Sequence, residues 1–161
     1  MLIEDQLADI FLQKYKGIMA YLNEGQYPDS IEEYTSLRSS IYENINQIKE
    51  DMFEMIGQDF FRSIESGVFG KFTFLKRYKQ GYILQHIETG IFYQVFCLTT
   101  PLDDLVEEYS IIETALIPYA NKIVCDGLII RSGVLIGNGM AKELRDGYWA
   151  AKRSGELVTS A

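Results

Sequence analysis

The chain has 161 residues, a mass of 18.5 kDa and a formal net charge of −8 at pH 7, and 47% of its residues are hydrophobic. This length predicts one domain that can bury a core without disulfides or metal ions, and the composition excludes a disordered tail. The acidic balance argues against broad electrostatic binding to nucleic acid or to an anionic membrane surface.

The first 70 residues predict an acidic, helical part. They hold 13 Asp and Glu but only 5 Lys and Arg, whereas the remaining residues hold ten of each. Apolar residues recur at helical spacing over 2–23, and Gly25 and Pro28 end this pattern. We therefore expect a first helix within these residues.

A second apolar pattern begins after Ser30, which can form a capping box with Glu33. Its spacing of three and four residues predicts one helix over about 30–56, or two helices with a break near Ser39-Ser40. A short third helix is expected at 60–64. The helix over 30–56 is more apolar than packing on one small sheet requires, so we also expect a homodimer through these residues.

From Gly70 onward the hydrophobic pattern changes to a period of two, which is typical of strands. Glycine, proline and asparagine separate the runs. We expect strands at about 72–78, 82–87, 91–98, 109–117, 122–130 and 134–136, and a short one at 157–159. Between the last two, apolar residues at helical spacing predict a helix that opens at Gly137-Asn138-Gly139.

These patterns predict an α+β fold. Two or three N-terminal helices (residues 1–69, the acidic helical part) precede a small, mostly antiparallel curled sheet or barrel with one C-terminal helix (residues 70–161). Closure into a barrel is expected because it removes exposed strand edges. With no flexible linker between them, the two parts are expected to pack together as one structural unit.

Residues 1–6 contain neither the basic stretch nor the apolar run of a signal peptide, and no apolar stretch reaches the ~18 residues that span a membrane. Cys97 and Cys125 lie in separate apolar runs and predict buried, reduced thiols, although a bridge between them is open if their strands are neighbours. We expect a cytoplasmic protein with no membrane partner.

Any hydrolytic centre would depend on His86, which is the only histidine. Glu113 and Asp126 are the other candidates, because each lies in a mostly apolar strand, where a paired acid can have a raised pKa. The alternative for Asp126 is a strand end, where its carboxylate satisfies local amides. No nucleophile elbow is present, so the enzyme hypothesis stays a secondary one and no catalytic residue is assigned.

Metal and cofactor sites are not predicted. One histidine and two distant cysteines do not supply the ligands of a structural zinc site. A cluster of four carboxylates lies at Asp103, Asp104, Glu107 and Glu108. It lacks the alternating oxygens and the glycine of a calcium loop, which indicates a solvated acidic loop.

Two segments are candidates for ligand binding. The first, Asn138 and Gly139, lies at a helix start, where free amides attract anions, although a turn and cap explains the pair equally well. The second is the hairpin over 71–82, which combines basic and aromatic residues that could bind single-stranded nucleic acid. Its binding candidates are Lys76, Arg77, Tyr78 and Tyr82. The alternative is a core of aromatic residues with a solvated basic edge.

Three stretches, taken together, carry a resemblance to known proteins. They are Gly70-Lys71-Phe72, the run over 113–129, and Gly137-Asn138-Gly139 followed by Leu157-Val158-Thr159-Ser160. Over about residues 58–161 the chain resembles an uncharacterised group of bacterial proteins of unknown function, some members of which carry a Cys-rich, SEC-C type metal-binding tail. The resemblance implies no activity. Here Cys125 stands where the group is expected to have an aromatic residue, and no Cys-rich tail follows, so no metal is implied.

The sequence favours a non-enzymatic binding or protein-interaction module. Aromatic residues make up 13% of the chain, and the 11 tyrosines exceed what a core of this size needs. Tyrosine is favoured at recognition surfaces because it provides a large contact area at low entropic cost. We expect an unknown protein partner on the barrel or on the acidic helices; binding of single-stranded nucleic acid and hydrolase-like activity are the alternatives.

Overall fold

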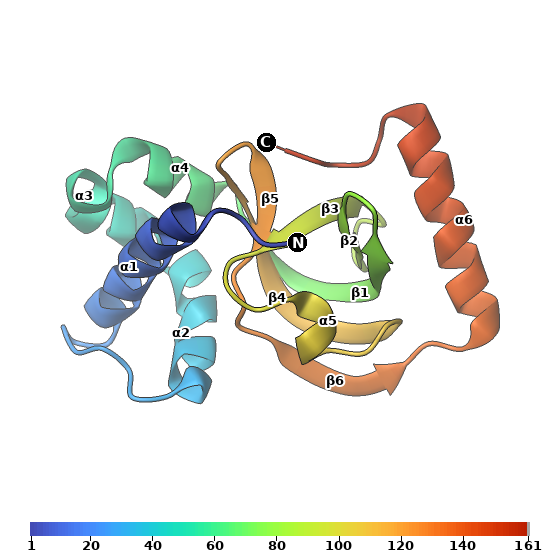
Figure 1. The fold of residues 1–161 in the computed structure, drawn as a ribbon. Helices are drawn as coiled ribbons and strands as arrows, with labels where there is room; N and C mark the ends of the chain where they lie inside the picture. The colour runs from blue at the N-terminus through green and yellow to red at the C-terminus, as the bar shows by residue number, and fades with distance from the viewer. Residues whose placement is uncertain (161) are drawn as a thin grey trace.

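A computed structural model describes residues 1–160, and it confirms the α+β class (Figure 1). Four helices come first: α1 (Asp5–Leu22), α2 (Ile31–Glu43), α3 (Ile45–Ile56) and α4 (Gln58–Glu65). They are followed by β1 (Val68–Tyr78), β2 (Gly81–His86), β3 (Phe92–Cys97), α5 (Leu102–Leu105), β4 (Ser110–Tyr119), β5 (Lys122–Cys125), β6 (Ile130–Leu135) and α6 (Asn138–Ser154). No helix within residues 1–160 has the length and apolar character needed to cross a bilayer.

The segment over 30–56 forms two helices, and the break lies at Asn44 rather than near Ser39-Ser40. The Ser39 hydroxyl donates to the Ser36 carbonyl at 3.3 Å, a bond that a continuous helix tolerates. The Ser40 carbonyl accepts from both the backbone amide and the side-chain amide of Asn44, at 3.0 and 2.9 Å, and these bonds close the end of α2. One half of the expected capping box forms, since the Ser30 hydroxyl accepts from the Glu33 amide at 3.2 Å. The Glu33 carboxylate accepts from the Asp29 amide at 2.9 Å rather than from that of Ser30.

The strands form one mostly antiparallel sheet in the order β1-β2-β3-β5-β4-β6. An additional antiparallel pairing of β1 with β4 closes five of these strands into a barrel, and only β3 and β5 are parallel. Because β4 returns to lie beside β1 after the meander β1-β2-β3, the connection is a Greek key. β6 lies outside this closed set, on the same edge of β4 as β5.

The strand predicted over 122–130 is interrupted. β5 ends at Cys125, and Gly127 adopts a left-handed φ of +80°, which turns the chain before β6 begins at Ile130. The predicted strand at 157–159 is reduced to one isolated bridge between Val158 and Tyr93.

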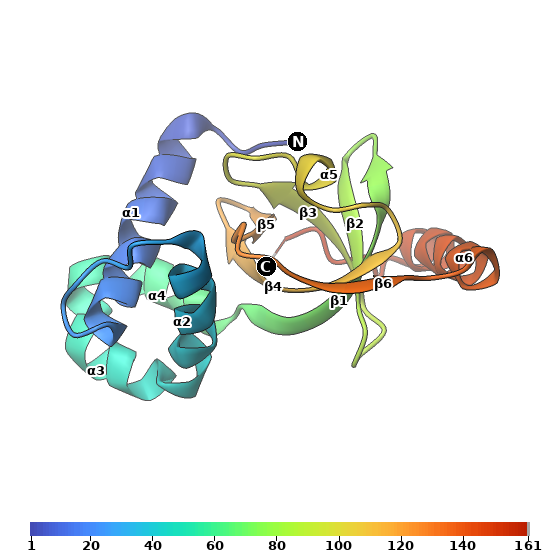
Figure 2. The same cartoon turned by 90° about the horizontal axis from the view of Figure 1, so that it is seen from below.

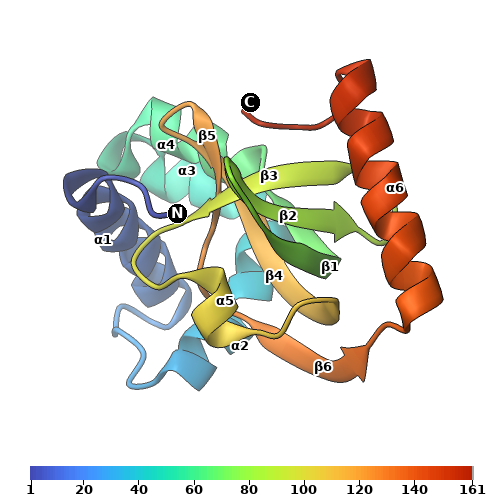
Figure 3. The ribbon, with the colours of Figure 1, turned by 45° about the vertical axis from the view of Figure 1, so that its right-hand side comes forward.

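Three clusters of buried residues hold the layers together. The largest joins all four N-terminal helices to the outer side of β4 and β5, and includes Phe11, Phe60 and Ile117. The second fills the barrel. The third packs Tyr148 and Ala151 of α6 over β1, β2 and β3. The helical part and α6 therefore lie on opposite sides of the barrel, as Figures 1 and 2 show, and Figure 3 brings α6 forward beside β1–β3.

Candidate functional site

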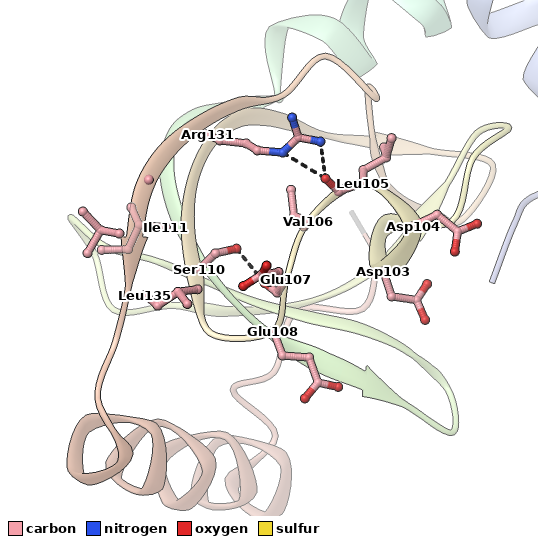
Figure 4. Close-up of a pocket in the computed structure, with 12 residues that line it drawn as sticks. Asp103, Asp104, Leu105, Val106, Glu107, Glu108, Ser110, Ile111, Arg131 and Leu135 are labelled. Atoms are coloured by element: carbon pink, nitrogen blue, oxygen red, sulfur yellow. Dashed lines mark hydrogen bonds between the residues drawn. The ribbon is translucent and has the colours of Figure 1, made fainter.

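A groove of about 760 Å³ lies between β6 and the segment that holds α5 (Figure 4). We call it the β6 groove. One wall is residues 103–108, the other is formed by residues 131–135 of β6, and Ser110 and Ile111 of β4 complete the lining. The guanidinium of Arg131 reaches across to Leu105, where its Nε donates to the carbonyl at 3.0 Å. This bond holds the two walls together.

β6 is the terminal strand of the sheet and is bonded to β4 on one edge only. All six of its residues are exposed, including the apolar side chains of Ile130 (44%), Val134 (49%) and Leu135 (57%). A register shift and a left-handed Gly133 (φ +76°) bend the strand. An exposed edge strand with apolar side chains is a template for pairing with another chain.

The groove is strongly acidic. Asp103, Asp104, Glu107 and Glu108 all line it and are exposed. Asp103 accepts a hydrogen bond from the Tyr82 hydroxyl at 2.9 Å and lies 4.0 Å from Arg77. Within residues 1–160 the other three carboxylates form no ion pair, and the Arg131 guanidinium bonds a carbonyl rather than a carboxylate. The groove therefore presents a net negative charge, because four carboxylates line it and Arg131 is the only cation among the described residues that line it.

A second polar site is buried where the helical part meets the barrel. Arg38 of α2 donates from Nη1 to both carboxylate oxygens of Asp126, at 3.0 and 2.9 Å, and neither side chain is exposed. The Tyr15 hydroxyl donates to the same carboxylate at 2.7 Å, and Thr114 donates at 3.1 Å. The Leu128 amide donates at 3.0 Å, so the expected local role of Asp126 is also fulfilled.

This buried network alters the ionisation of its members. Burial alone would lower the pKa of the Arg38 guanidinium, but the charge and hydrogen bonds of Asp126 raise it above its ordinary value. Burial, together with the Asp126 charge, raises the pKa of the Tyr15 hydroxyl well above its usual range. The site therefore keeps the Arg38 guanidinium charged and the Tyr15 phenol neutral, and its hydrogen bonds join the helical part to the barrel.

The two cysteines lie opposite one another on the parallel strands β3 and β5, in register and both reduced. They line an apolar cavity of about 410 Å³ between the helical part and the barrel, together with Tyr15 and Asp126. Burial raises the pKa of the Cys97 thiol to about 12 and that of Cys125 to about 11. Because the thiolate is the reactive form, both thiols are unreactive near neutral pH.

Native-state alkylation tests this assignment. We expect iodoacetamide to modify neither Cys97 nor Cys125 appreciably at pH 7.5, and to modify both rapidly once the chain is unfolded in urea, where the thiol pKa returns to ~8.5. In the folded chain, labelling should rise only as the pH approaches 11. Intact-mass spectrometry reads the result, and complete labelling of the folded chain at pH 7.5 would contradict it.

The three hydrolase candidates have different bonding partners, and among the described residues they do not contact one another through hydrogen bonds or ion pairs. His86 bonds Thr89 through Nδ1 at 2.8 Å and packs on the Phe72 ring. Asp126 bonds the groups described above, and Glu113 lies on β4 opposite Lys71. Within residues 1–160 no hydrogen bond or ion pair joins any two of the three. The arrangement gives no support to a hydrolytic centre made of these groups.

The four hairpin candidates have different environments. Tyr82 is buried inside the barrel, and Tyr78 packs under α6 with its ring 4.5 Å from that of Tyr148. Lys76 lies over the Tyr78 ring at 5.1 Å, and Arg77 is exposed. The structure therefore places the aromatic pair in packing contacts and leaves the basic side chains outside.

Asn138 and Gly139 are exposed at the first turn of α6, and no side chain caps this helix. A metal site is not found: within the described part of the chain no three His, Cys, Asp or Glu side chains gather closely enough to hold an ion.

Sequence reasoning missed Arg38 and the free edge of β6. A signal for Arg38 was present, because it follows Tyr34 by four residues and precedes Ile41 by three and therefore shares their apolar helix face. A cation on an apolar helix face and an acid in an apolar strand each need a buried partner of opposite charge, so the sequence could have suggested that Arg38 pairs with Asp126. The exposure of β6 had no such signal, since Val134-Leu135-Ile136 resembles a core strand.

Comparison with known proteins found no family model, no curated protein and no solved structure that matches the chain. The resemblance over residues 58–161 and its implications therefore stay expectations.

Proposed function

We propose that this protein is a non-enzymatic protein-interaction module and that its docking surface is the β6 groove. The observation that carries the proposal is the single-sided bonding of β6, whose six residues are all exposed. Strand addition at a free edge gives affinity through main-chain hydrogen bonds, and alternate side chains give specificity. The groove beside this edge offers space for the side chains of such a partner.

The geometry supports nucleic-acid binding less well. OB-folds are five-stranded Greek-key barrels that bind oligonucleotides on strands 2 and 3, so fold-level analogy directs attention to that face. In this chain Tyr148 of α6 packs there against Ile83 and Phe92. The rings needed for base stacking are buried or covered, and the β6 groove carries the wrong charge for phosphates.

Two further expectations stay predictions. Ile31 and Met55, at the two ends of the segment over 30–56, are exposed apolar side chains that would suit the expected homodimer interface. The expected cytoplasmic location is the other, and nothing in the structure tests it.

A selection from a random peptide display library on the full-length chain tests the proposed function. We expect the selected peptides to slow amide hydrogen exchange in residues 130–136, because added main-chain bonds protect the free edge. Val134→Asp with Leu135→Asp should abolish their binding. The matched control is Met55→Asp, at an even more exposed apolar position on α3, which should leave binding unchanged. Peptides that instead protect the helical part or α6 would contradict the proposal.

A further inference from the structure

We infer that the occupant of the β6 groove is an extended, basic peptide segment of a partner protein, which adds to β6 as a further strand. This inference rests on the proposed function and specifies the chemistry of the partner.

The unpaired edge of β6 can form main-chain hydrogen bonds with a partner segment only if that segment is extended. β6 contains no Pro and no Lys, two residues that commonly protect edge strands, and its one cation, Arg131, is bonded to the Leu105 carbonyl. The bulge at Gly133 divides the edge but does not cover it. A strand paired with this edge would place successive side chains alternately on its two faces.

The charge of the groove selects cations. The wall over 103–108 carries four exposed carboxylates, of which only Asp103 has a cation within 4.0 Å. In Figure 4 the side chains of Asp103, Asp104 and Glu108 extend from this wall away from β6, so they form the acidic rim of the groove. Lys or Arg at alternate positions of the added strand would lie in the field of this acidic rim, while the intervening apolar residues lie on the opposite face of the strand.

The same charge argues against a second copy of this chain as occupant. Two β6 strands related by a twofold axis would bring two acidic walls together, and each copy already carries a net charge of −8. Like charges across an interface disfavour that pairing, so the complementary partner is a different, basic chain.

Fluorescence anisotropy with short labelled peptides tests the inference on the full-length chain. A peptide in which Lys and Val alternate is compared with the Ser/Val and Glu/Val peptides of equal length. We expect the Lys/Val peptide to bind at least about tenfold more tightly than the Ser/Val peptide, the Glu/Val peptide not to bind, and added salt to weaken the interaction.

Two sets of variants test whether the carboxylates of the β6 groove, rather than the net charge of the chain, attract the Lys/Val peptide. Asp103→Asn, Asp104→Asn, Glu107→Gln and Glu108→Gln together should remove the advantage of the Lys/Val peptide. Glu24→Gln, Glu43→Gln, Glu50→Gln and Glu54→Gln make the same change in net charge on the exposed surface of the helical part and should preserve it. Equal losses in both sets would show a net-charge effect and overturn the inference.

N-methylation of the peptide backbone tests whether the peptide binds through main-chain hydrogen bonds along one of its edges. Methyl groups on alternate residues remove the donors along one edge of the peptide, so one methylated series should lose binding and the other should retain it. If the Ser/Val peptide binds β6 as well as the Lys/Val peptide, the charge inference is wrong and the interaction module stands. If light scattering shows a dimer that Val134→Asp dissolves, the occupant is a second copy. If no peptide slows exchange in residues 130–136, both proposals are overturned.

Discussion

Replacing Asp126 by Asn is expected to lower the free energy of unfolding by about 3–5 kcal/mol, because it leaves the Arg38 guanidinium buried without a counter-charge. Every group around the carboxylate is a donor: Tyr15, Arg38, Thr114 and the Leu128 amide. The amide nitrogen of Asn would face one of these donors and lose its bond. Urea unfolding followed by circular dichroism measures the change.

Two controls separate the buried charge from a general effect of the substitution. Asp146→Asn removes an exposed pair with Lys142 on α6 and should cost far less, since solvent screens that pair. The double variant Arg38→Met with Asp126→Leu should be much more stable than the two single changes would suggest, because it removes both charges. A stability of Asp126→Asn close to that of the wild type would refute the role assigned to the pair.

Replacing Phe11 by Ala is expected to cost about 3–5 kcal/mol, because it removes a fully buried ring and leaves a cavity. The ring centroid of Phe11 lies 5.1 Å from that of Tyr15, 5.4 Å from that of Phe60 and 5.1 Å from that of Tyr119. Phe11 of α1 therefore contacts both α4 and β4 and joins the helical part to the barrel.

The same variant tests whether the two parts unfold together. Trp149, the only tryptophan, lies on α6 at the opposite side of the barrel, so its fluorescence reports on that side while circular dichroism reports mainly on the helices. We expect Phe11→Ala to shift both unfolding midpoints equally. Ile10→Ala, at a partly exposed neighbouring position, should shift them much less. A shift confined to the helical signal would show that the barrel folds independently.

The local sequence pattern identifies many residues of the candidate sites, but it does not identify the residues that face them. The acidic segment over 103–108 is visible in the sequence, as is the anomaly of Asp126 in an apolar strand. Neither observation indicates its partner, because Arg38 precedes Asp126 by 88 residues and the facing wall of the groove comes from β6. Side-chain pairing across such separations depends on how the strands are ordered.

The fold divides in the same way. The sequence alone determined the helical first part, the change to a strand period near residue 70 and the last helix, because these follow from local hydrophobic periodicity and from capping and turn residues. Only the tertiary structure decided that β1 pairs with β4, that β3 runs parallel to β5, that α6 covers the face of β2 and β3, and that β6 keeps a free edge. Strand pairing and the position of free edges depend on contacts between residues that are distant in sequence, and local propensity carries no information about such contacts.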